Sequence, residues 1–424
     1  MIRSSTLTAL LLCSLTSHAA PKAEGAPKMN EGESKFATQL YGRLASTPGN
    51  LFFSPASIRI AMGMAYAGAK GATAEQMRVT LGLPEGKAAH TQVAAQLARW
   101  ESFAHPKLSP AATQNSDPSM QKYWEEDLLR RTIRLNSANA LFTQRGNPLR
   151  ADYLATLKGD YNASALPVDF IKATEAARVE INQWVSQRTN KKIPELIAPR
   201  LITSATRSVL VNTIYFKAAW MSVFTQGTTK DGPFFATPTE QVRVPLMRQI
   251  EHFMISRFAG GAMLELPYGS GNLAMYVILP TAKDGLPAIE KQLAAGSLPT
   301  WLSSLKGERV DVTLPRFKIT GSFDLGDTLK AMGMPLAFSF PGADFSRVDD
   351  TKTLFLSTVV HQAVVEVDEQ GTEAAAATAA MMGPGGMPSE PTVFRADHPF
   401  IFLIRDAETG AILFLGRLSR PVAK

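Results

Sequence analysis

An unusual segment in the C-terminal part of the chain reads Glu369-Gln-Gly-Thr-Glu-Ala-Ala-Ala-Ala-Thr-Ala-Ala-Met-Met-Gly-Pro-Gly-Gly-Met387, and it joins two apolar, strand-like runs, Val359–Val367 and Phe400–Ile404. Alanine is the best helix former, so the segment by itself fits an exposed helix or a flexible linker. On a strand, its small uncharged side chains would share one face, and the segment would also fit between two strands of a sheet while Glu373 points to solvent. These side chains belong to Thr372, Ala374, Ala376, Thr378 and Ala380. A loop that can stay outside a sheet or enter it stores a conformational change.

The composition is that of a folded globular protein. The chain has 424 residues, of which 45% are hydrophobic and 19% charged, which is enough apolar material for a large core. Its 44 Lys and Arg against 37 Asp and Glu give a net charge of +7, and the basic residues are scattered among acidic ones, which disfavours nucleic acid as a partner. No apolar run reaches the roughly eighteen residues that a bilayer requires, so we expect no membrane-spanning segment.

Residues 1–20 have the pattern of a secretory signal peptide. Arg3 precedes an apolar stretch, Leu7–Leu15, that is too short to cross a bilayer, and Ser17–Ala20 supplies small residues for cleavage. A buried N-terminal helix is disfavoured because the next residues, 21–32, are rich in Pro, Lys, Glu and Gly and are expected to be flexible. The protein is therefore predicted to be secreted, extracellular or, in a bacterium, periplasmic. The single cysteine of the chain lies inside the signal peptide, so disulfides, thiolate metal sites and a cysteine nucleophile are excluded from the mature protein.

Helix signals dominate the first two hundred residues, and strand signals dominate the rest. Ser54 and Pro55 predict a helix N-cap followed by proline in the first turn. Thr73 and Gln76 predict a capping box, and a further helix is expected to begin near Thr174. This order favours a single α+β domain. Strands are expected at Val209–Phe216, Leu264–Leu266, Leu273–Leu279, Val310–Leu314, Phe355–Val367, Phe400–Ile404 and Ala411–Leu415.

The mature chain carries no recognisable catalytic or metal-binding motif. Its histidines lack partners at helical or strand spacing, which disfavours a metal site. The sequence has no Gly-x-Ser-x-Gly elbow, no phosphate-binding Gly-rich loop and no dinucleotide fingerprint. Ser303 and Lys306 match the Ser-x-x-Lys pattern of penicillin-binding enzymes, but this short pattern arises readily by chance and no Lys-Thr-Gly follows it. We therefore expect no cofactor, no metal and no enzyme activity, although a triad assembled from distant residues stays open.

Ten short motifs occur along the chain in a characteristic order. They are Asn50–Ile58, Gly68–Thr73, Ala138–Phe142, Ile181–Val185, Val211–Lys217 followed by Trp220, Leu266–Tyr268, Met275–Pro280, Leu314–Phe317, Glu369–Glu373 and Phe394–Phe400. In this order and register they are similar to the motifs of the serpins, and the resemblance extends from about Glu33 to Leu418. One motif alone is weak evidence, but this many together outweigh the linker interpretation of the Ala-rich segment.

The resemblance implies a single α+β domain, residues 33–424, with about eight to nine helices around three β-sheets and an exposed reactive-centre loop over about residues 369–393. In inhibitory serpins a target serine protease cleaves this loop and forms an acyl-enzyme, and the cut loop then enters the large sheet as a new strand. The protease is dragged across the molecule, and its catalytic site is distorted before water can release it. The resemblance therefore implies an irreversible, monomeric inhibitor without a cofactor, whose partner is a serine protease held in a covalent complex.

Several residues acquire roles through the resemblance. The hinge has no charged or bulky residue on its inserting face, as in inhibitory serpins, with Gly371 for mobility and Thr372 at the first inserting position. The hinge comprises Glu369, Gly371, Thr372, Glu373, Ala374, Ala375, Ala376, Ala377 and Thr378. The family's shutter, a polar cluster beneath the centre of the opening sheet, maps onto Ser54, Ser57, Asn212 and His361. Trp220 maps onto the breach, where the loop first enters the sheet.

Two ways of counting place the scissile bond differently. Counting from the hinge gives Gly385-Gly386, whereas counting back from Phe394–Phe400 gives Met387, and Met382 is an alternate that would leave a short inserting segment. Because no Arg or Lys lies nearby, the target is expected to be elastase-like, chymotrypsin-like or subtilisin-like rather than trypsin-like. The alternative is a non-inhibitory serpin-fold binding or storage protein whose loop is cut as a substrate.

Overall fold

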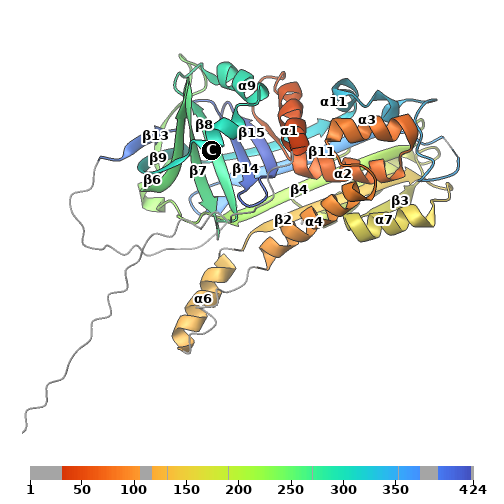
Figure 1. Ribbon diagram of the computed structural model, residues 1–424, viewed down its shortest axis with the longest axis horizontal. Coiled ribbons are helices and arrows are strands. Elements are labelled where there is room, and N and C mark those ends of the chain that lie inside the picture. Colours follow the sequence, from red (N-terminus) through yellow and green to blue (C-terminus); the bar gives the residue numbers. More distant parts are fainter. Residues whose placement is uncertain are drawn as a thin grey trace, which may run out of the picture.

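The computed structural model describes residues 31–105, 117–130, 132–189, 191–269, 271–351, 353–372 and 390–421 (Figure 1). Within these residues the chain forms ten α-helices and two β-sheets, one of six strands and one of nine. The α+β class predicted from the sequence is confirmed, with slightly more helices than expected. The predicted signal peptide, residues 1–20, lies outside the described residues. None of the described helices is long and apolar enough to cross a membrane.

The six-stranded sheet has the strand order β10-β11-β12-β4-β2-β3. In its middle, β4 runs antiparallel to β2 but parallel to β11. Both β4 and β11 are buried along almost their whole length, as expected of strands that are covered on both faces. The strands span Phe317–Asp324 (β10), Thr358–Val367 (β11), Gly371–Thr372 (β12), Ser208–Ala219 (β4), Arg134–Gln144 (β2) and Ser164–Val168 (β3).

The nine-stranded sheet follows the order β1-β15-β14-β8-β7-β6-β9-β13, with β5 paired to β6 beside this path. Three sheets were expected, and the structure differs because β6, 18 residues long, is shared between two groups of strands. The first part of β6 pairs with β5, its middle with β9 and its last part with β7, so one strand joins what would otherwise be separate sheets. The strands span Leu51–Phe53 (β1), Ile412–Leu418 (β15), Phe400–Asp406 (β14), Leu273–Pro280 (β8), Gly261–Tyr268 (β7), Gln241–Phe258 (β6), Lys306–Pro315 (β9), Thr392–Arg395 (β13) and Lys230–Phe235 (β5).

Helices cover both faces of the six-stranded sheet. The helix α2, Pro55–Gly68, is buried at nearly every position and packs between β4 and β15 in the main hydrophobic core. On the opposite face α8, Thr174–Arg188, packs Ala177, Ile181 and Val185 into a second, smaller core. Helix α6 projects away from the rest of the molecule (Figure 1). The remaining helices are Glu31–Leu44 (α1), Gly71–Leu81 (α3), Lys87–Ala104 (α4), Pro118–Arg130 (α6), Ala151–Tyr161 (α7), Leu286–Ala294 (α9), Leu298–Ser303 (α10) and Gly326–Met332 (α11).

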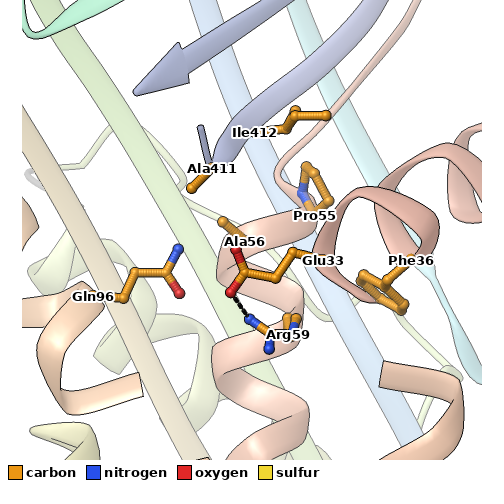
Figure 2. A pocket seen from close by; sticks show the side chains of 8 residues that line it. All are labelled: Glu33, Phe36, Pro55, Ala56, Arg59, Gln96, Ala411 and Ile412. Carbon is orange, nitrogen blue, oxygen red and sulfur yellow. Dashed lines mark hydrogen bonds and ion pairs between the residues drawn. The ribbon is translucent and has the colours of Figure 1, made fainter. Parts of the chain in front are cut away.

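A buried arginine ties α2 to its neighbours. Arg59 is only 2% exposed, and Figure 2 shows its guanidinium paired with Glu33 of α1. Its Nε donates to the Leu81 carbonyl at 2.9 Å and its Nη2 to the Gln92 side chain at 3.1 Å. Burial lowers the pKa of Arg59, and the neighbouring Glu33 carboxylate opposes this shift. A cavity of about 10 Å³ beside the pair has room for one water at most.

Of the two helix caps predicted from the sequence, one is present in the structure and one is not. Ser54 is the N-cap of α2, as predicted. The capping box predicted for α3 is wrong, because the two side chains bind a distant segment instead of their own helix. The Thr73 hydroxyl accepts a hydrogen bond from the Asp344 backbone N–H, and the Gln76 carbonyl accepts one from the Leu336 N–H. The polar groups that the sequence pattern assigned to the helix cap therefore make tertiary hydrogen bonds instead.

Gly321 of β10 lies where the six-stranded sheet crosses β1. A Cβ atom at this position would lie 1.9 Å from the Phe52 carbonyl oxygen, which belongs to the backbone of a paired strand. We expect Gly321→Ala to lower the free energy of unfolding by about 1–3 kcal/mol or more, measured through the thermal unfolding midpoint. Gly159→Ala in α7 is the matched control, since nothing lies within 4 Å of a Cβ there, and it should stabilise by up to about 1 kcal/mol. Equal midpoints would contradict this interpretation of the crossing.

Candidate functional site

The candidate site is the boundary between β4 and β11, which we call the seam. Along the seam Thr358–Val364 of β11 pairs in parallel with Val209–Tyr215 of β4. Beyond the seam β12 lies between the two strands and pairs with both, with Thr372 opposite Ala218 on one side and opposite Val367 on the other. Thr372, the last described residue before Glu390, therefore lies inside the sheet at one end of the seam.

A buried aromatic pair closes this end of the seam. Thr372 is fully buried, and its hydroxyl lies 2.8 Å from the hydroxyl of Tyr268. The ring of Trp220 stacks on the Tyr268 ring at 4.4 Å, and the Trp220 indole N–H donates to the Asp368 carbonyl at 2.9 Å. Burial raises the pKa of Tyr268 far above its ordinary value, so its hydroxyl stays a neutral hydrogen-bonding group. The residue predicted to lie at the breach thus contacts the ring that holds Thr372.

A tight turn connects β11 to β12. Gly371 has φ = +150°, and a Cβ atom there would lie 2.1 Å from the Ala218 carbonyl oxygen, so no side chain fits. The Asp368 carboxylate accepts hydrogen bonds from the backbone N–H groups of Gln370, at 2.9 Å, and Gly371, at 3.2 Å. Burial raises the pKa of Asp368, and these two hydrogen bonds oppose that shift. The turn is therefore specified by glycine at one position and by a local acceptor at another.

The start of the predicted hinge is anchored by an ion pair. Glu369 is 2% exposed, and the single Nε–H of Arg316 is shared between both of its carboxylate oxygens at 2.8 Å. Arg316 Nη2 donates a further hydrogen bond to the same carboxylate at 2.5 Å. The Thr229 hydroxyl donates a further hydrogen bond at 2.5 Å. Burial by itself would raise the pKa of Glu369, but the hydrogen bonds from Arg316 and Thr229 lower it below its ordinary value. Glu369 is therefore a charged, paired anchor at the base of the turn.

Beneath the seam, the four predicted shutter residues form one hydrogen-bonded cluster. The His361 ring lies 2.5 Å from the Asn212 side-chain oxygen, across the seam. The Asn212 amide donates to the Ser57 hydroxyl at 2.6 Å and to the Asn139 side-chain oxygen at 2.5 Å. The Ser54 hydroxyl accepts from the Ser57 N–H at 3.1 Å. The cluster therefore links α2, β2, β4 and β11 at the level where the two seam strands meet.

The hydrogen bonds of His361 fix its protonation state. The Ser54 backbone N–H donates to Nε2 at 3.1 Å, so this nitrogen carries no proton, and Nδ1 donates to Asn212. Burial lowers the pKa of His361 to about 3, an effect that the hydrogen bond with Asn212 partly opposes. The ring is therefore neutral near pH 7. If Nε2 were also protonated, its N–H would point at the Ser54 backbone N–H, and neither group could accept a hydrogen bond from the other.

Part of the predicted site lies outside the described residues. This applies to the hinge residues Glu373, Ala374, Ala375, Ala376, Ala377 and Thr378, and to the reactive-bond candidates Met382, Gly385, Gly386 and Met387. Sequence reasoning also missed three residues that the structure brings to the site, Tyr268, Arg316 and Asn139. Each of them lies inside one of the ten motifs, so the signal was present but carried no assigned role. No cluster of His, Cys, Asp and Glu suited to a metal ion occurs in the described part of the chain.

The neutral, buried state of His361 predicts a loss of stability in acid. In the unfolded chain the imidazole has a pKa near 6.5, whereas in the folded chain the pKa is about 3. Between these values only the unfolded state takes up the proton, so stability falls by up to about 1.4 kcal/mol per pH unit as the pH drops. We expect His361→Gln to remove this part of the pH dependence of urea unfolding between pH 7 and 4, and the exposed-site control His252→Gln to retain it. Identical pH profiles for all three proteins would contradict the assignment.

Comparisons with known proteins place this geometry in a family. The family described as Serpin (serine protease inhibitor) matches residues 31–421. A serpin-like protein of Thermococcus kodakarensis is 41% identical, over 91% of this chain and 84% of its own length. Leukocyte elastase inhibitor of Xenopus laevis is 38% identical, over 89% of this chain and 94% of its own length. Among solved structures, human thyroxine-binding globulin in complex with thyroxine superposes with a TM-score of 0.77 at 30% identity, over 93% of this chain and 98% of its own. The family match covers nearly the whole chain, and the six-stranded sheet holds β12 between β4 and β11. This chain is therefore a member of the serpin family.

Proposed function

We propose that this serpin inhibits serine proteases irreversibly. A protease would cleave the loop between Thr372 and Glu390 and form an acyl-enzyme, and the cut segment would enter the seam and carry the protease with it. The observation that carries the proposal is the position of β12, because Thr372 is already paired with both strands of the seam. A strand that continued from Thr372 in the same direction would run down the seam.

The register of β12 supports this proposal. Continued along β4 it would bring Thr378 opposite Asn212, and continued along β11 it would bring Thr378 opposite His361. Asn212 and His361 are themselves opposite each other across the seam, so the two registers agree and one strand fits both edges without a bulge. The side chains that would turn toward the shutter are small. They belong to Thr372, Ala374, Ala376, Thr378 and Ala380.

The hydrogen-bond pattern of the seam supplies a driving force. The seam is a parallel pairing, which is slightly less stable per residue than an antiparallel one. An inserted strand would replace it with two antiparallel ladders, and each added hydrogen bond contributes about 0.5–1.5 kcal/mol net. The intact loop is held at both ends, at Thr372 and at β13, so cleavage between them would free the segment to insert.

We also propose the target class and the location of the protein. The favoured scissile bond is Gly385–Gly386, with Met382 and Met387 as alternates, and elastase-like, chymotrypsin-like or subtilisin-like enzymes suit these residues. A relative named leukocyte elastase inhibitor supports this class. The protein would act as an exported monomer, after removal of residues 1–20.

A second candidate is a serpin-fold binding protein whose loop is cut as a substrate. The similarity to thyroxine-binding globulin supports this candidate, because the solved structure of that relative is a complex with thyroxine. The two candidates differ in the fate of the protease after cleavage. A trapping serpin keeps the protease, whereas a binding protein releases it with its activity intact.

The deciding experiment incubates the protein with elastase-like, chymotrypsin-like, subtilisin-like and trypsin-like proteases and reads the products on denaturing gels. We expect a band of protease plus serpin that resists SDS with one of the first three classes. Sequencing of the released C-terminal fragment locates the bond. Clean cleavage without such a band, in all four reactions, would rule out trapping and leave the binding protein.

Thr372→Arg tests insertion separately from cleavage. Thr372 is fully buried between β4 and β11, so a guanidinium there would keep β12 out of the sheet, and the segment that follows could not enter the seam behind it. We expect the variant to be cleaved at the parental rate, to form no SDS-resistant complex and to gain no thermal stability after cleavage, whereas the cleaved parent becomes more stable. Thr239→Arg, at an exposed position, is the control and should trap like the parent. Full trapping by Thr372→Arg would show that the seam is not the insertion site.

A further inference from the structure

A hollow in the surface lies between the first turns of α1 and the C-terminal ends of α3 and α11, three helices that contact one another (Figure 1). Its volume is about 200 Å³, far more than one water needs. Phe36, Val79 and Met332 contribute apolar side chains to its lining, and Lys35 and Gln39 contribute polar ones. We call this hollow the helix pocket.

The lining of the helix pocket leaves apolar surface in contact with solvent. Val79, in the last turn of α3, is 63% exposed, although Phe36 beside the same pocket is fully buried. Met332, at the end of α11, packs only partly against the core. A concave apolar surface with polar residues beside it is the usual form of a binding pocket, so the helix pocket suits an apolar side chain.

The chain itself leads to the helix pocket from outside the described residues. Gly32 of α1 lines the pocket, and Met29 precedes it by three residues, a span of at most about 11 Å. Met29 is the only large apolar residue in the segment 21–30, whose other residues are Pro, Lys, Ala, Glu, Gly and Asn. Methionine has an unbranched, flexible side chain that fills irregular gaps well. An apolar side chain of the right kind is therefore tethered within reach of the pocket.

The electrostatics of the helix pocket suit the residue next to Met29. The helices α3 and α11 both end at the pocket, with Gly82 and Gly333 as their C-caps. The C-terminal end of a helix carries a partial negative charge, which favours a nearby cation. Lys28 would bring an ammonium group to these two helix ends when Met29 occupies the pocket.

We propose that residues 21–30 fold back onto the helix pocket, with Met29 inside it and Lys28 beside the C-terminal ends of α3 and α11. The segment would act as an N-terminal clamp on the body of the protein. This inference goes beyond the proposed function, because it concerns the native fold and requires neither a protease nor the reactive loop.

The first turn of α1 gives such a clamp a role. The backbone of Gly32 lies so close to Gly82 that a Cβ atom on Gly82 would be 2.5 Å from it. The same turn carries Glu33, the ion-pair partner of the buried Arg59 (Figure 2). Helix ends fray, and fraying here would leave Arg59 buried without its partner, which is energetically costly. A docked segment would hold the turn in place, so its removal by a protease would destabilise the native protein.

The test measures whether the segment covers Val79. Cys13 is the only cysteine of the chain, so the protein without residues 1–20 has no native thiol, and Val79→Cys places a single thiol at the helix pocket. We expect iodoacetamide to alkylate this thiol about tenfold more slowly in residues 21–424 than in residues 31–424, because a segment that is docked about nine-tenths of the time exposes the thiol for the remaining tenth. The control is Val179→Cys on α8, at a position that is 39% exposed, which should react equally fast in both lengths.

Met29→Asp tests the occupant without shortening the chain, so the comparison does not depend on how well residues 31–424 fold. A carboxylate is unfavourable in an apolar pocket, and we expect the Val79→Cys thiol to be alkylated about tenfold faster when Met29→Asp is added. The thermal unfolding midpoint of Met29→Asp should fall by about 2 °C. Ala23→Asp is the matched control, and it should keep both the slow alkylation and the parental midpoint.

Three results would overturn the inference. Equal alkylation rates of Val79→Cys in the long and the short protein would show that residues 21–30 do not cover the pocket. Unchanged slow alkylation in Met29→Asp would show that Met29 is not the side chain that occupies it. Protection that survives removal of residues 21–30 and increases with protein concentration would show that a second copy of the chain covers the pocket instead. None of these readouts depends on whether the protein traps a protease.

Discussion

The parallel pairing of β4 with β11 is the contact on which the rest of the structure depends. It closes the six-stranded sheet only as far as Tyr215 and Val364, because β12 separates the strands beyond that point. The buried contact between His361 and Asn212 crosses this pairing, and the backbone of Ser54 ties it to the start of α2. The same few groups therefore hold the sheet together and define where it can divide.

The chain leaves the six-stranded sheet at Thr372 and is described again from Glu390, just before β13 of the nine-stranded sheet. The ion pairs beside these two points differ in how deeply they are buried. Beside β12 the Glu369 carboxylate is almost fully buried against Arg316. A shift of the turn that separated the two would leave the carboxylate buried without its partner, which is energetically costly. Beside β13 the Arg257 and Glu308 pair is more exposed, at 53% and 28%, and is correspondingly weaker. The turn before β12 is therefore held more strongly by its ion pair than β13 is.

Sequence patterns predicted the class and the buried strands, because these depend on local apolar periodicity. The resemblance grouped Ser54, Ser57, Asn212 and His361, and the structure brings these four residues into one hydrogen-bonded cluster. The patterns predicted none of the strands in the first two hundred residues, although β2 carries Asn139 into the polar cluster. The strand Arg134–Gln144 is continuously buried only in its second half, so its sequence lacks a full strand pattern. The pair of Glu369 with Arg316 joins residues 53 positions apart, which no local pattern reports.

The pairing of β1 with β15 has a consequence for how the chain folds. Leu51 pairs with Arg417 and Phe53 with Leu415, so residues from opposite ends of the domain share one ladder. Ser54, which follows β1, also donates its hydroxyl to the Leu413 carbonyl at 2.6 Å. Closing so long a loop is slow and must wait until the C-terminal strands have been synthesised. The Ser54 hydroxyl, which belongs to the polar cluster, therefore gains its acceptor in β15 only when the last strands of the chain have been made.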